Sequence, residues 1–120
     1  MAQLTDNIQL VIGNSLNLST EHKFRMIYFD PPFNSDRDYK LNHNSDVGFS
    51  DKWTDADYEK FISKNIDKLY DLLEKDGTLF FHISSTCMYI PEKILRAKFK
   101  FVEPIFWKKC RSKNNVKSKL

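Results

Sequence analysis

The order of apolar segments in this 120-residue sequence predicts a single domain of the α/β class. Two observations support this prediction: strand-length apolar runs recur along the chain, and segments with helical apolar spacing lie between them. Strands that alternate with helices form a layered sheet, so the expected architecture is Rossmann-like, with about four strands and flanking helices. The runs expected as strands are residues 8–12, 26–29, 78–83 and 101–107.

The first strand is expected at residues 8–12, which read Ile-Gln-Leu-Val-Ile. Gly13, Asn14 and Ser15 follow as the turn that leaves this strand, because glycine and asparagine tolerate turn geometry. A short helix is expected over residues 16–22, before the second strand.

The second strand leads into the most informative segment of the chain. Residues 26–29 read Met-Ile-Tyr-Phe, a pattern typical of a buried strand, and Asp30, Pro31 and Pro32 follow directly. Proline has no N–H group to donate to a sheet, so the strand is expected to end at Asp30 in a stiff, extended turn. Open α/β sheets bind ligands at the carboxyl ends of their strands, which makes this turn a candidate site.

The turn carries the groups needed to hold a planar molecule with an amino group. The Asp30 carboxylate and the Pro31 carbonyl can each accept one amino hydrogen, and the Phe33 ring can lie against the face of the molecule. The alternative interpretation is a turn that only ends a strand, with Phe33 packed in the core.

The segment from Asp30 to Phe33 resembles the Asp-Pro-Pro-Tyr/Phe motif of the DNA amino-methyltransferases. Residues 27–29, Asn34 and Tyr39 resemble the permuted β-class of restriction-modification systems, in which the catalytic motif precedes the glycine-rich cofactor loop. The resemblance implies an S-adenosylmethionine-dependent methyltransferase fold that methylates the exocyclic amine of a base flipped out of double-stranded DNA. Asp in the first motif position favours adenine N6, because many cytosine enzymes carry Ser there.

The resemblance also implies a role for each residue of the motif and for Asn14. Relatives often carry an acid at the position of Asn14, where it contacts the amino group of the cofactor's adenine; the alternative is that Asn14 only forms the turn. The implied site residues are Asp30, Pro31, Pro32 and Phe33 for catalysis, Asn14 and Asp30 for the cofactor, and Phe33, Asn34 and Tyr39 for the substrate.

The family's Phe-x-Gly-x-Gly loop, which holds S-adenosylmethionine, does not occur in this sequence, whose glycines are Gly13, Gly48 and Gly77. Residues 1–107 are therefore expected to form part of a catalytic domain, and residues 108–120 the stump of a missing carboxyl-terminal half. We expect the isolated chain to bind the cofactor poorly and to be weakly active or inactive. That missing half or a restriction subunit would be its partner.

A long polar stretch, residues 34–54, follows the motif and is expected to form a loop over the active site. It contains Tyr39, Phe49 and Trp53, and aromatic side chains in such a loop can stack on a flipped base or on its neighbours. The alternative is that Phe49 and Trp53 pin the loop to the core, which is the preferred interpretation for Trp53 because it lies next to the following helix.

A capping box at Thr54 and Asp57 predicts the start of a long helix with one apolar stripe. This helix is expected to end at Gly77, which would supply a left-handed cap. The strand at 78–83 is apolar almost throughout, as expected when helices cover both faces of a sheet.

Three hydroxyl residues, Ser84, Ser85 and Thr86, follow that strand. They are expected to cap the next helix, at residues 91–98, in preference to contacting substrate or phosphate. The last strand, residues 101–107, contains Pro104 and should therefore be an edge strand or carry a bulge.

Composition excludes several classes of protein. No apolar run reaches the roughly 20 residues that span a bilayer, and the first residues lack the pattern of a signal peptide. Cys87 and Cys110 are expected as free thiols, which fits a reducing, cytoplasmic location. His22, His43 and His82 are too scattered to indicate a metal site, so we expect a structural role for each and no metal.

The net charge of +3 is unevenly distributed along the chain. Residues 108–120 hold six basic side chains and no acid, which leaves the first 107 residues at −3. This basic segment is interpreted either as an arm that binds phosphates or as a solvated tail.

Two other functions are compatible with the sequence. A similar Pro-Pro-aromatic turn serves methyltransferases that act on RNA adenines or on protein glutamine amides, although these usually carry their glycine loop before the motif. A non-enzymatic nucleic-acid-binding module would use the basic tail and the loop aromatics without chemistry.

Overall fold

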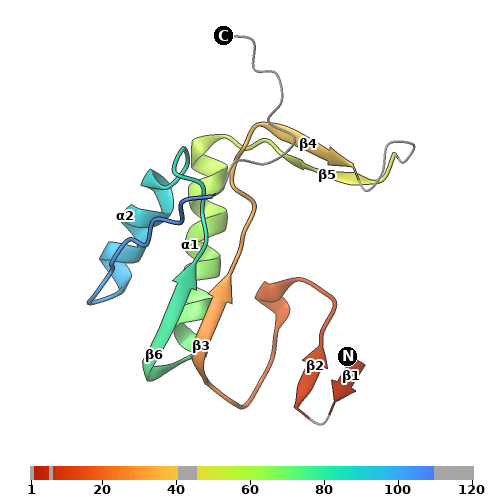
Figure 1. The fold of residues 1–120 in the computed structure, drawn as a ribbon, viewed down its shortest axis with the longest axis vertical. Helices are drawn as coiled ribbons and strands as arrows, with labels where there is room; N and C mark the ends of the chain where they lie inside the picture. The colour runs from red at the N-terminus through yellow and green to blue at the C-terminus, as the bar shows by residue number, and fades with distance from the viewer. Residues whose placement is uncertain (1, 6, 41–45, 110–120) are drawn as a thin grey trace.

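The computed structural model describes residues 2–5, 7–40 and 46–109, with side chains described from residue 7 onward. Its centre is a parallel pair of strands, β3 (Phe24–Phe29) and β6 (Leu73–Phe81), packed against helices α1 (Asp55–Leu72) and α2 (Tyr89–Lys98) (Figure 1). This arrangement confirms a mixed α/β structure with a parallel sheet, while the larger Rossmann-like sheet stays a prediction.

The register of β3 and β6 brings the carboxyl ends of both strands to the same level. Met26 pairs with Thr78, and the pairing continues to Phe29 opposite Phe81. The His82 N–H then donates to the Phe29 carbonyl over 2.8 Å, so the chains leave the sheet side by side. The strand predicted at 26–29 is confirmed, with its end immediately before Asp30 as the prolines require.

Helix α1 begins as the capping box predicts. The Thr54 hydroxyl accepts a hydrogen bond from the Asp57 N–H at 3.1 Å. One stripe of the helix is buried, and each large apolar side chain in it stabilises the fold by about 1.5–3 kcal/mol. The core residues on this stripe are Tyr58, Ile62, Ile66 and Leu69, with Ile90 of α2 packed against them.

The predicted end of this helix is wrong. Helix α1 stops at Leu72, and β6 begins at once with Leu73, which pairs with Phe24. Gly77 lies inside β6, where the register with β3 shifts, and a Cβ atom there would stand 2.9 Å from the Phe24 carbonyl oxygen. The glycine therefore permits close approach of two backbones rather than a left-handed helix cap.

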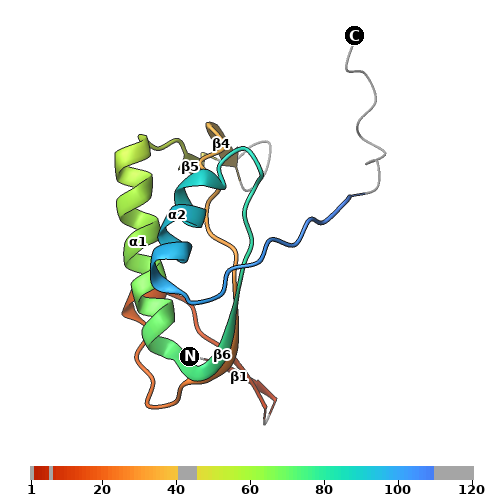
Figure 2. The same cartoon turned by 90° about the vertical axis from the view of Figure 1, so that its left-hand side faces the viewer.

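The two helices cover only one face of the β3–β6 sheet (Figure 2). On the other face the side chains of Met26 and Tyr28 are 63% and 58% exposed, and Phe80 is 40% exposed. The expectation that helices cover both faces of this sheet is wrong for the part of the chain that the structure describes.

The first strand predicted from the sequence is shorter and differently placed than expected. Strand β2 (Ile8–Leu10) pairs in antiparallel fashion with β1 (Ala2–Thr5), in a separate two-stranded sheet. Ile12 lies outside the strand and is 89% exposed. In place of a helix over residues 16–22, the chain forms a single 3₁₀ turn, η1 (Ser15–Asn17).

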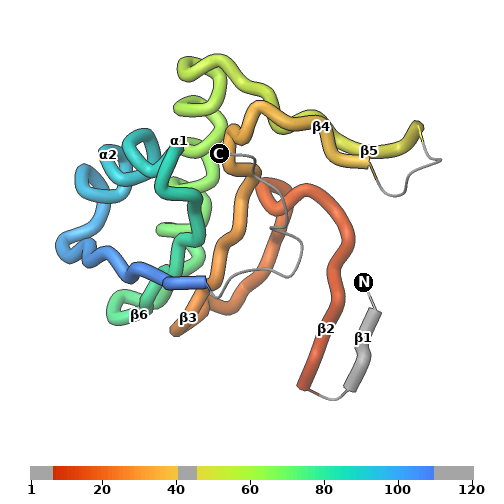
Figure 3. Tube along the Cα trace, turned by 45° about the horizontal axis from the view of Figure 1, so that its top comes forward, coloured from red at the N-terminus to blue at the C-terminus, as the bar shows by residue number. Residues whose placement is uncertain are grey.

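The stretch 34–54 is not a structureless loop. It contains an antiparallel hairpin of β4 (Arg37–Lys40) and β5 (Gly48–Asp51), which lies apart from the helices (Figure 3). The rings of Tyr39 and Phe49 stack across the hairpin with centroids 5.0 Å apart. Phe49 is 59% exposed, so it does not pin the segment to the core.

Helix α2 carries Pro91 in its first turn, as predicted. The predicted capping by residues 84–86 is wrong, because the residue before the helix is Met88, which makes no side-chain capping bond. Ser84 and Thr86 instead hydrogen-bond to each other at 2.9 Å. Residues 101–107 form no strand; Ile105 and Phe106 there are each 79% exposed.

Candidate functional site

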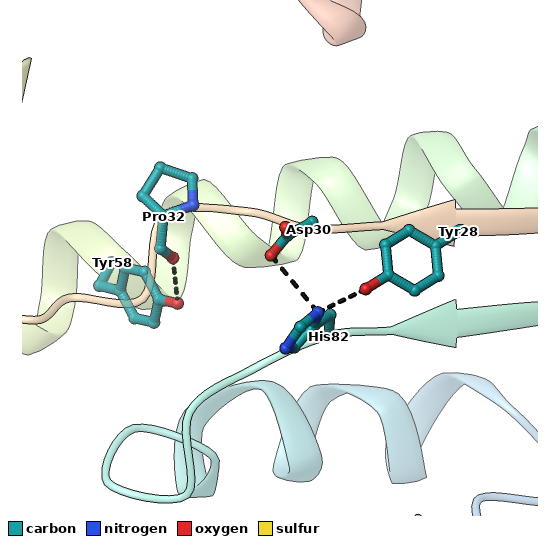
Figure 4. Close-up of polar contacts among 5 residues, drawn as sticks. All are labelled: Tyr28, Asp30, Pro32, Tyr58 and His82. Atoms are coloured by element: carbon teal, nitrogen blue, oxygen red, sulfur yellow. Dashed lines mark hydrogen bonds and ion pairs between the residues drawn. The ribbon is translucent and has the colours of Figure 1, made fainter. Parts of the chain in front are cut away.

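The carboxyl ends of β3 and β6 place Asp30 beside His82 (Figure 4). The Asp30 side chain is 54% exposed, and its Oδ1 lies 3.9 Å from Nδ1 of His82. The hydroxyl of Tyr28 is hydrogen-bonded to the same imidazole nitrogen. The predicted catalytic carboxylate is therefore open to solvent and has a histidine, rather than a lysine or arginine, as its near neighbour.

Aromatic rings surround this histidine. The centroid of the Phe33 ring lies 5.5 Å from the His82 ring, and the Trp107 ring lies 6.2 Å from it. Phe33 is half-buried and Trp107 is 73% exposed. The edge of the sheet thus combines an exposed acid with flat apolar surfaces, which suits a planar, aminated ligand.

Helix α1 holds the turn at the second proline. The Pro32 carbonyl accepts a hydrogen bond of 2.7 Å from the Tyr58 hydroxyl (Figure 4), and the neighbouring Pro31 is buried. Burial is the main cause that raises the pKa of the Tyr58 hydroxyl, and its proximity to the Cys87 sulfur and the Asp51 carboxylate adds to the effect. The hydroxyl consequently keeps its proton and serves as a permanent donor to the turn.

The residues after the prolines are held by a second acid, Asp51, at the end of β5. Its carboxylate accepts hydrogen bonds from the backbone N–H groups of Phe33, Asn34 and Ser35 at 2.9–3.2 Å. Burial alone would raise the pKa of Asp51, but hydrogen bonds from Ser35, Asn34 and Trp53 outweigh burial and lower it. Asp51 therefore stays ionised although it is only 2% exposed.

Two of the remaining predicted residues also lie on this turn or close to it. The side-chain oxygen of Asn34 accepts from the Trp53 N–H at 3.1 Å, so in this structure it fixes the turn. The Tyr39 hydroxyl is 3.0 Å from the Ser35 hydroxyl, which connects the hairpin to the segment after the motif. Trp53 packs on the rings of Tyr58 and Phe61, as the preferred interpretation of this residue predicts.

Asn14 belongs to a different part of the fold. Its side-chain oxygen accepts from the Leu16 N–H at 3.0 Å and so caps η1. The neighbouring Ser15 hydroxyl donates to the side chain of Asn65 on α1 at 3.3 Å. In the structure Asn14 therefore has the turn-forming role, which was the alternative interpretation. A contact of Asn14 with a cofactor stays a prediction.

Sequence reasoning missed three residues of this site: His82, Asp51 and Tyr58. His82 had a usable signal, because it lies near the carboxyl end of the strand predicted at 78–83 and so near the edge at which Asp30 lies. Tyr58 and Asp51 had none, since they contact the motif only through tertiary packing. Their partners lie 26 residues away for Tyr58 and 16–18 residues away for Asp51.

The exposed Asp30 carboxylate beside aromatic rings has the chemistry that would stabilise a positively charged group, such as the sulfur of S-adenosylmethionine. The glycines form no loop around this acid, because Gly48 lies in the hairpin and Gly77 in β6. Within residues 2–5, 7–40 and 46–109 no cluster of histidine, cysteine or acidic side chains is suited to hold a metal ion. The helices in these ranges are too short or too polar to cross a membrane.

Comparison with known proteins identifies relatives of this chain. A family model described as DNA methylase matches residues 24–120, which include the turn, the hairpin and both helices. The Type II methyltransferase M.EcaI of Enterobacter cloacae is 28% identical over 99 residues, which cover 80% of this chain but only 22% of that protein. No solved structure matches the chain. Because the family model covers most of the sequence, including the Asp30–Phe33 motif, the chain belongs to the DNA methylase family.

Proposed function

We propose that this chain carries the base-binding turn of a DNA methyltransferase that methylates adenine N6 with S-adenosylmethionine as donor. The observation that supports the proposal most directly is the Asp30 carboxylate, which is exposed and lies at the carboxyl edge of a parallel sheet, next to aromatic rings. Membership of the DNA methylase family gives this carboxylate its expected substrate, the amino group of a base in duplex DNA.

Asp30 would act on the amine by hydrogen bonding. An adenine amine is a weak nucleophile because its lone pair is delocalised into the ring. Acceptance of an amino hydrogen by Asp30, and of another by the Pro31 carbonyl, localises the lone pair and aligns it. S-adenosylmethionine supplies an electrophilic methyl group, so a nitrogen–carbon bond forms as the sulfur–carbon bond breaks and its electron pair returns to sulfur. The surplus proton on nitrogen then leaves to Asp30 or to water.

The aromatic residues would hold the base while it reacts. A base flipped out of the duplex loses its stacking partners, and the half-buried Phe33 ring can replace one of them. Asn34 and Tyr39 would border the base pocket. The preference for adenine over cytosine rests on Asp30 in the first position of the motif, since Ser is common there in enzymes that act on cytosine.

The chain spans about a fifth of the relative's length, and we infer that a larger assembly completes the enzyme. A polypeptide with a glycine-rich loop would hold the methionine part of the cofactor, and Asn14 would contact its adenine. A restriction subunit is a further candidate partner. We therefore expect turnover by the 120-residue chain alone to be weak or absent.

The first test is a methylation assay on genomic DNA from a host that lacks DNA methylation, since such DNA presents every recognition sequence. The chain is incubated with radiolabelled S-adenosylmethionine, alone and with the segment that follows the matched region in a relative. Digestion to nucleosides and mass spectrometry then separate N6-methyladenine from N4-methylcytosine. N6-methyladenine in the completed enzyme is the expected result, and N4-methylcytosine would contradict the assignment to adenine.

Asp30→Asn is the key variant in that assay. We expect its methylation to fall at least about 100-fold, because it loses the charged acceptor at the amine. The matched control is Asp67→Asn, which removes an exposed acid of α1 that pairs with Lys98 at 3.0 Å. Equal loss of activity in both variants would argue against a specific role of Asp30.

A second candidate, a binding module without chemistry, is favoured by the exposed Tyr39–Phe49 stack and the exposed Trp107 ring. Both types of surface can stack on bases of single-stranded nucleic acid. Asp30→Ala separates the two functions. A binding module keeps its DNA affinity and shows no methylation in the completed assembly, whereas the enzyme loses methylation when Asp30 is removed.

A further inference from the structure

We propose that Asp51 is a positioning residue, whose carboxylate holds the backbone of residues 33–35 so that the Phe33 ring lies at the edge of the base pocket. The inference deepens the proposed function and rests on it only for the expected effect on methylation. The placement of the Phe33 ring itself can be tested without any enzymatic activity.

The carboxylate of Asp51 is saturated with hydrogen bonds. Oδ2 accepts from the N–H groups of Phe33 and Ser35 at 3.2 and 2.9 Å, and from the Ser35 hydroxyl at 2.6 Å. Oδ1 accepts from the Asn34 N–H at 2.9 Å and from the Trp53 indole at 3.2 Å. Charged acceptors make hydrogen bonds roughly twice as strong as neutral ones, so these five contacts fix the turn firmly.

The backbone of the turn is built to receive an anion. Asn34 has φ of 56° and Asp36 has φ of 58°, both in the left-handed region. Left-handed residues between right-handed or extended ones turn successive N–H groups toward one point, and such concave arrangements bind anions. Asparagine and aspartate adopt this region more readily than other non-glycine residues, and the contacts with Asp51 hold the backbone in it.

Within residues 7–40 and 46–109, no lysine or arginine forms an ion pair with this carboxylate. The neighbouring Lys52 pairs with Asp38 at 2.8 Å instead. The charge of Asp51 is therefore balanced by backbone and side-chain dipoles of the turn itself. Removal of that charge should release the turn and leave the rest of the hairpin in place.

Phe33 lies between two fixed points. On one side the Pro32 carbonyl is bound by Tyr58, and on the other side the N–H groups of residues 33–35 are bound by Asp51. With both attachments in place, the centroid of the Phe33 ring lies 5.5 Å from the centroid of the His82 ring. Loss of the Asp51 contacts should consequently change the distance between the Phe33 and His82 rings.

The ring protons of His82 report this distance by nuclear magnetic resonance, because an aromatic ring shifts the resonances of protons close to it. We would record these resonances in the full chain for the wild type, Asp51→Asn, and Phe33→Leu as the reference for a lost ring. Asp38→Asn serves as the matched control, since Asp38 is an exposed acid in the same hairpin. Hydrogen exchange of the amides of residues 33–35 is measured in the same samples.

The expected result is that Asp51→Asn moves the His82 resonances in the direction of Phe33→Leu and speeds amide exchange at residues 33–35 at least about tenfold. Asp38→Asn should change neither readout. If Asp51→Asn does not fold, Ser35→Ala removes one of the five hydrogen bonds and should produce a smaller change of the same sign. Unchanged His82 resonances and unchanged exchange in a folded Asp51 or Ser35 variant would overturn the proposal.

Methylation by the completed assembly gives the second readout. A turn that is misplaced by about 1 Å can reduce turnover on the order of 100-fold, so kcat should fall in Asp51→Asn while KM for S-adenosylmethionine changes little. If the wild type methylates nothing but the His82 resonances still move, the proposed function fails and the positioning role stands. If the wild type methylates and Asp51→Asn retains full kcat, the positioning role is overturned.

Discussion

The carboxylate of Asp51 also makes the stability of the chain depend on pH. Its pKa is lowered in the folded state, so the unfolded chain binds a proton more readily than the folded chain does. The stability that Asp51 contributes is therefore fully present above the unfolded value of about 3.9, and it is lost as pH falls below that value through the folded pKa.

Urea unfolding between pH 3 and pH 7 tests this dependence. At pH 7 we expect Asp51→Asn to lower the free energy of unfolding by about 1–3 kcal/mol, because the amide leaves buried N–H donors poorly matched. The difference from the wild type should shrink as pH falls below about 4. Asp38→Asn is again the control. Asp38 is exposed, so its replacement should hardly change the free energy of unfolding at pH 7. A constant difference across the whole range would contradict the titration of Asp51.

At the scale of single residues, the sequence predicted what local chemistry determines. Proline cannot donate to a sheet, so the end of the strand at Asp30 and the stiff turn after it could be derived from the order of residues alone. The partners of this turn could not be derived, because Tyr58 and Asp51 reach it only after α1 and the hairpin have folded against it. Tertiary hydrogen bonds of this kind carry no local signal.

At the scale of elements, the boundaries that failed are those set by packing between strands. Gly77 has the sequence context of a helix end, yet the chain enters β6 four residues earlier because Leu73 pairs with Phe24. Residues 101–107 have the composition of a strand. A strand also requires hydrogen bonds to a neighbouring strand, and the structure has no such pairing at these residues. Helix α1 was predictable at its start because a cap is a local interaction.

The close approach at Gly77 leads to a prediction about β6. In Gly77→Ala the new Cβ would stand 2.9 Å from the Phe24 carbonyl oxygen, and this neighbour is backbone, which cannot move freely. We expect the free energy of unfolding to fall by about 1–3 kcal/mol as the β3–β6 pairing opens. Thermal unfolding followed by circular dichroism measures it. Thr78→Ala, at an exposed neighbouring position, should cost much less, and equal costs would mean that Gly77 has no special packing role.

At the scale of the whole molecule, the charge is unevenly distributed along the chain. The sheet edge presents the acid Asp30, whereas six of the 19 basic residues follow Trp107, whose ring lies 6.2 Å from the His82 ring. Only Lys108 and Lys109 of this basic segment are among the described residues, and both are exposed; Cys110 and the rest of the tail, like His43, lie outside them. An arm that binds DNA and a solvated end differ in their effect on DNA binding.

The salt dependence of DNA binding distinguishes a basic segment that contacts phosphates from one that is only solvated. Each lysine that contacts a phosphate releases bound counterions, so the slope of log K against log salt concentration becomes steeper by about 0.9 per contact. If the basic segment is an arm, substitution of Lys108 and Lys109 by glutamine should flatten the slope by up to about 1.8 and weaken binding to all duplexes alike.

The matched control replaces Lys93 and Lys98 of α2, which pair with Glu59 and Asp67 and are therefore already neutralised within the protein. Fluorescence anisotropy with a labelled duplex at 50–200 mM salt, on the order of physiological ionic strength, covers the required range. A slope that is unchanged in the Lys108 and Lys109 variant, or that flattens equally in the control, would mean that these two lysines contact no phosphate, as expected for a solvated tail.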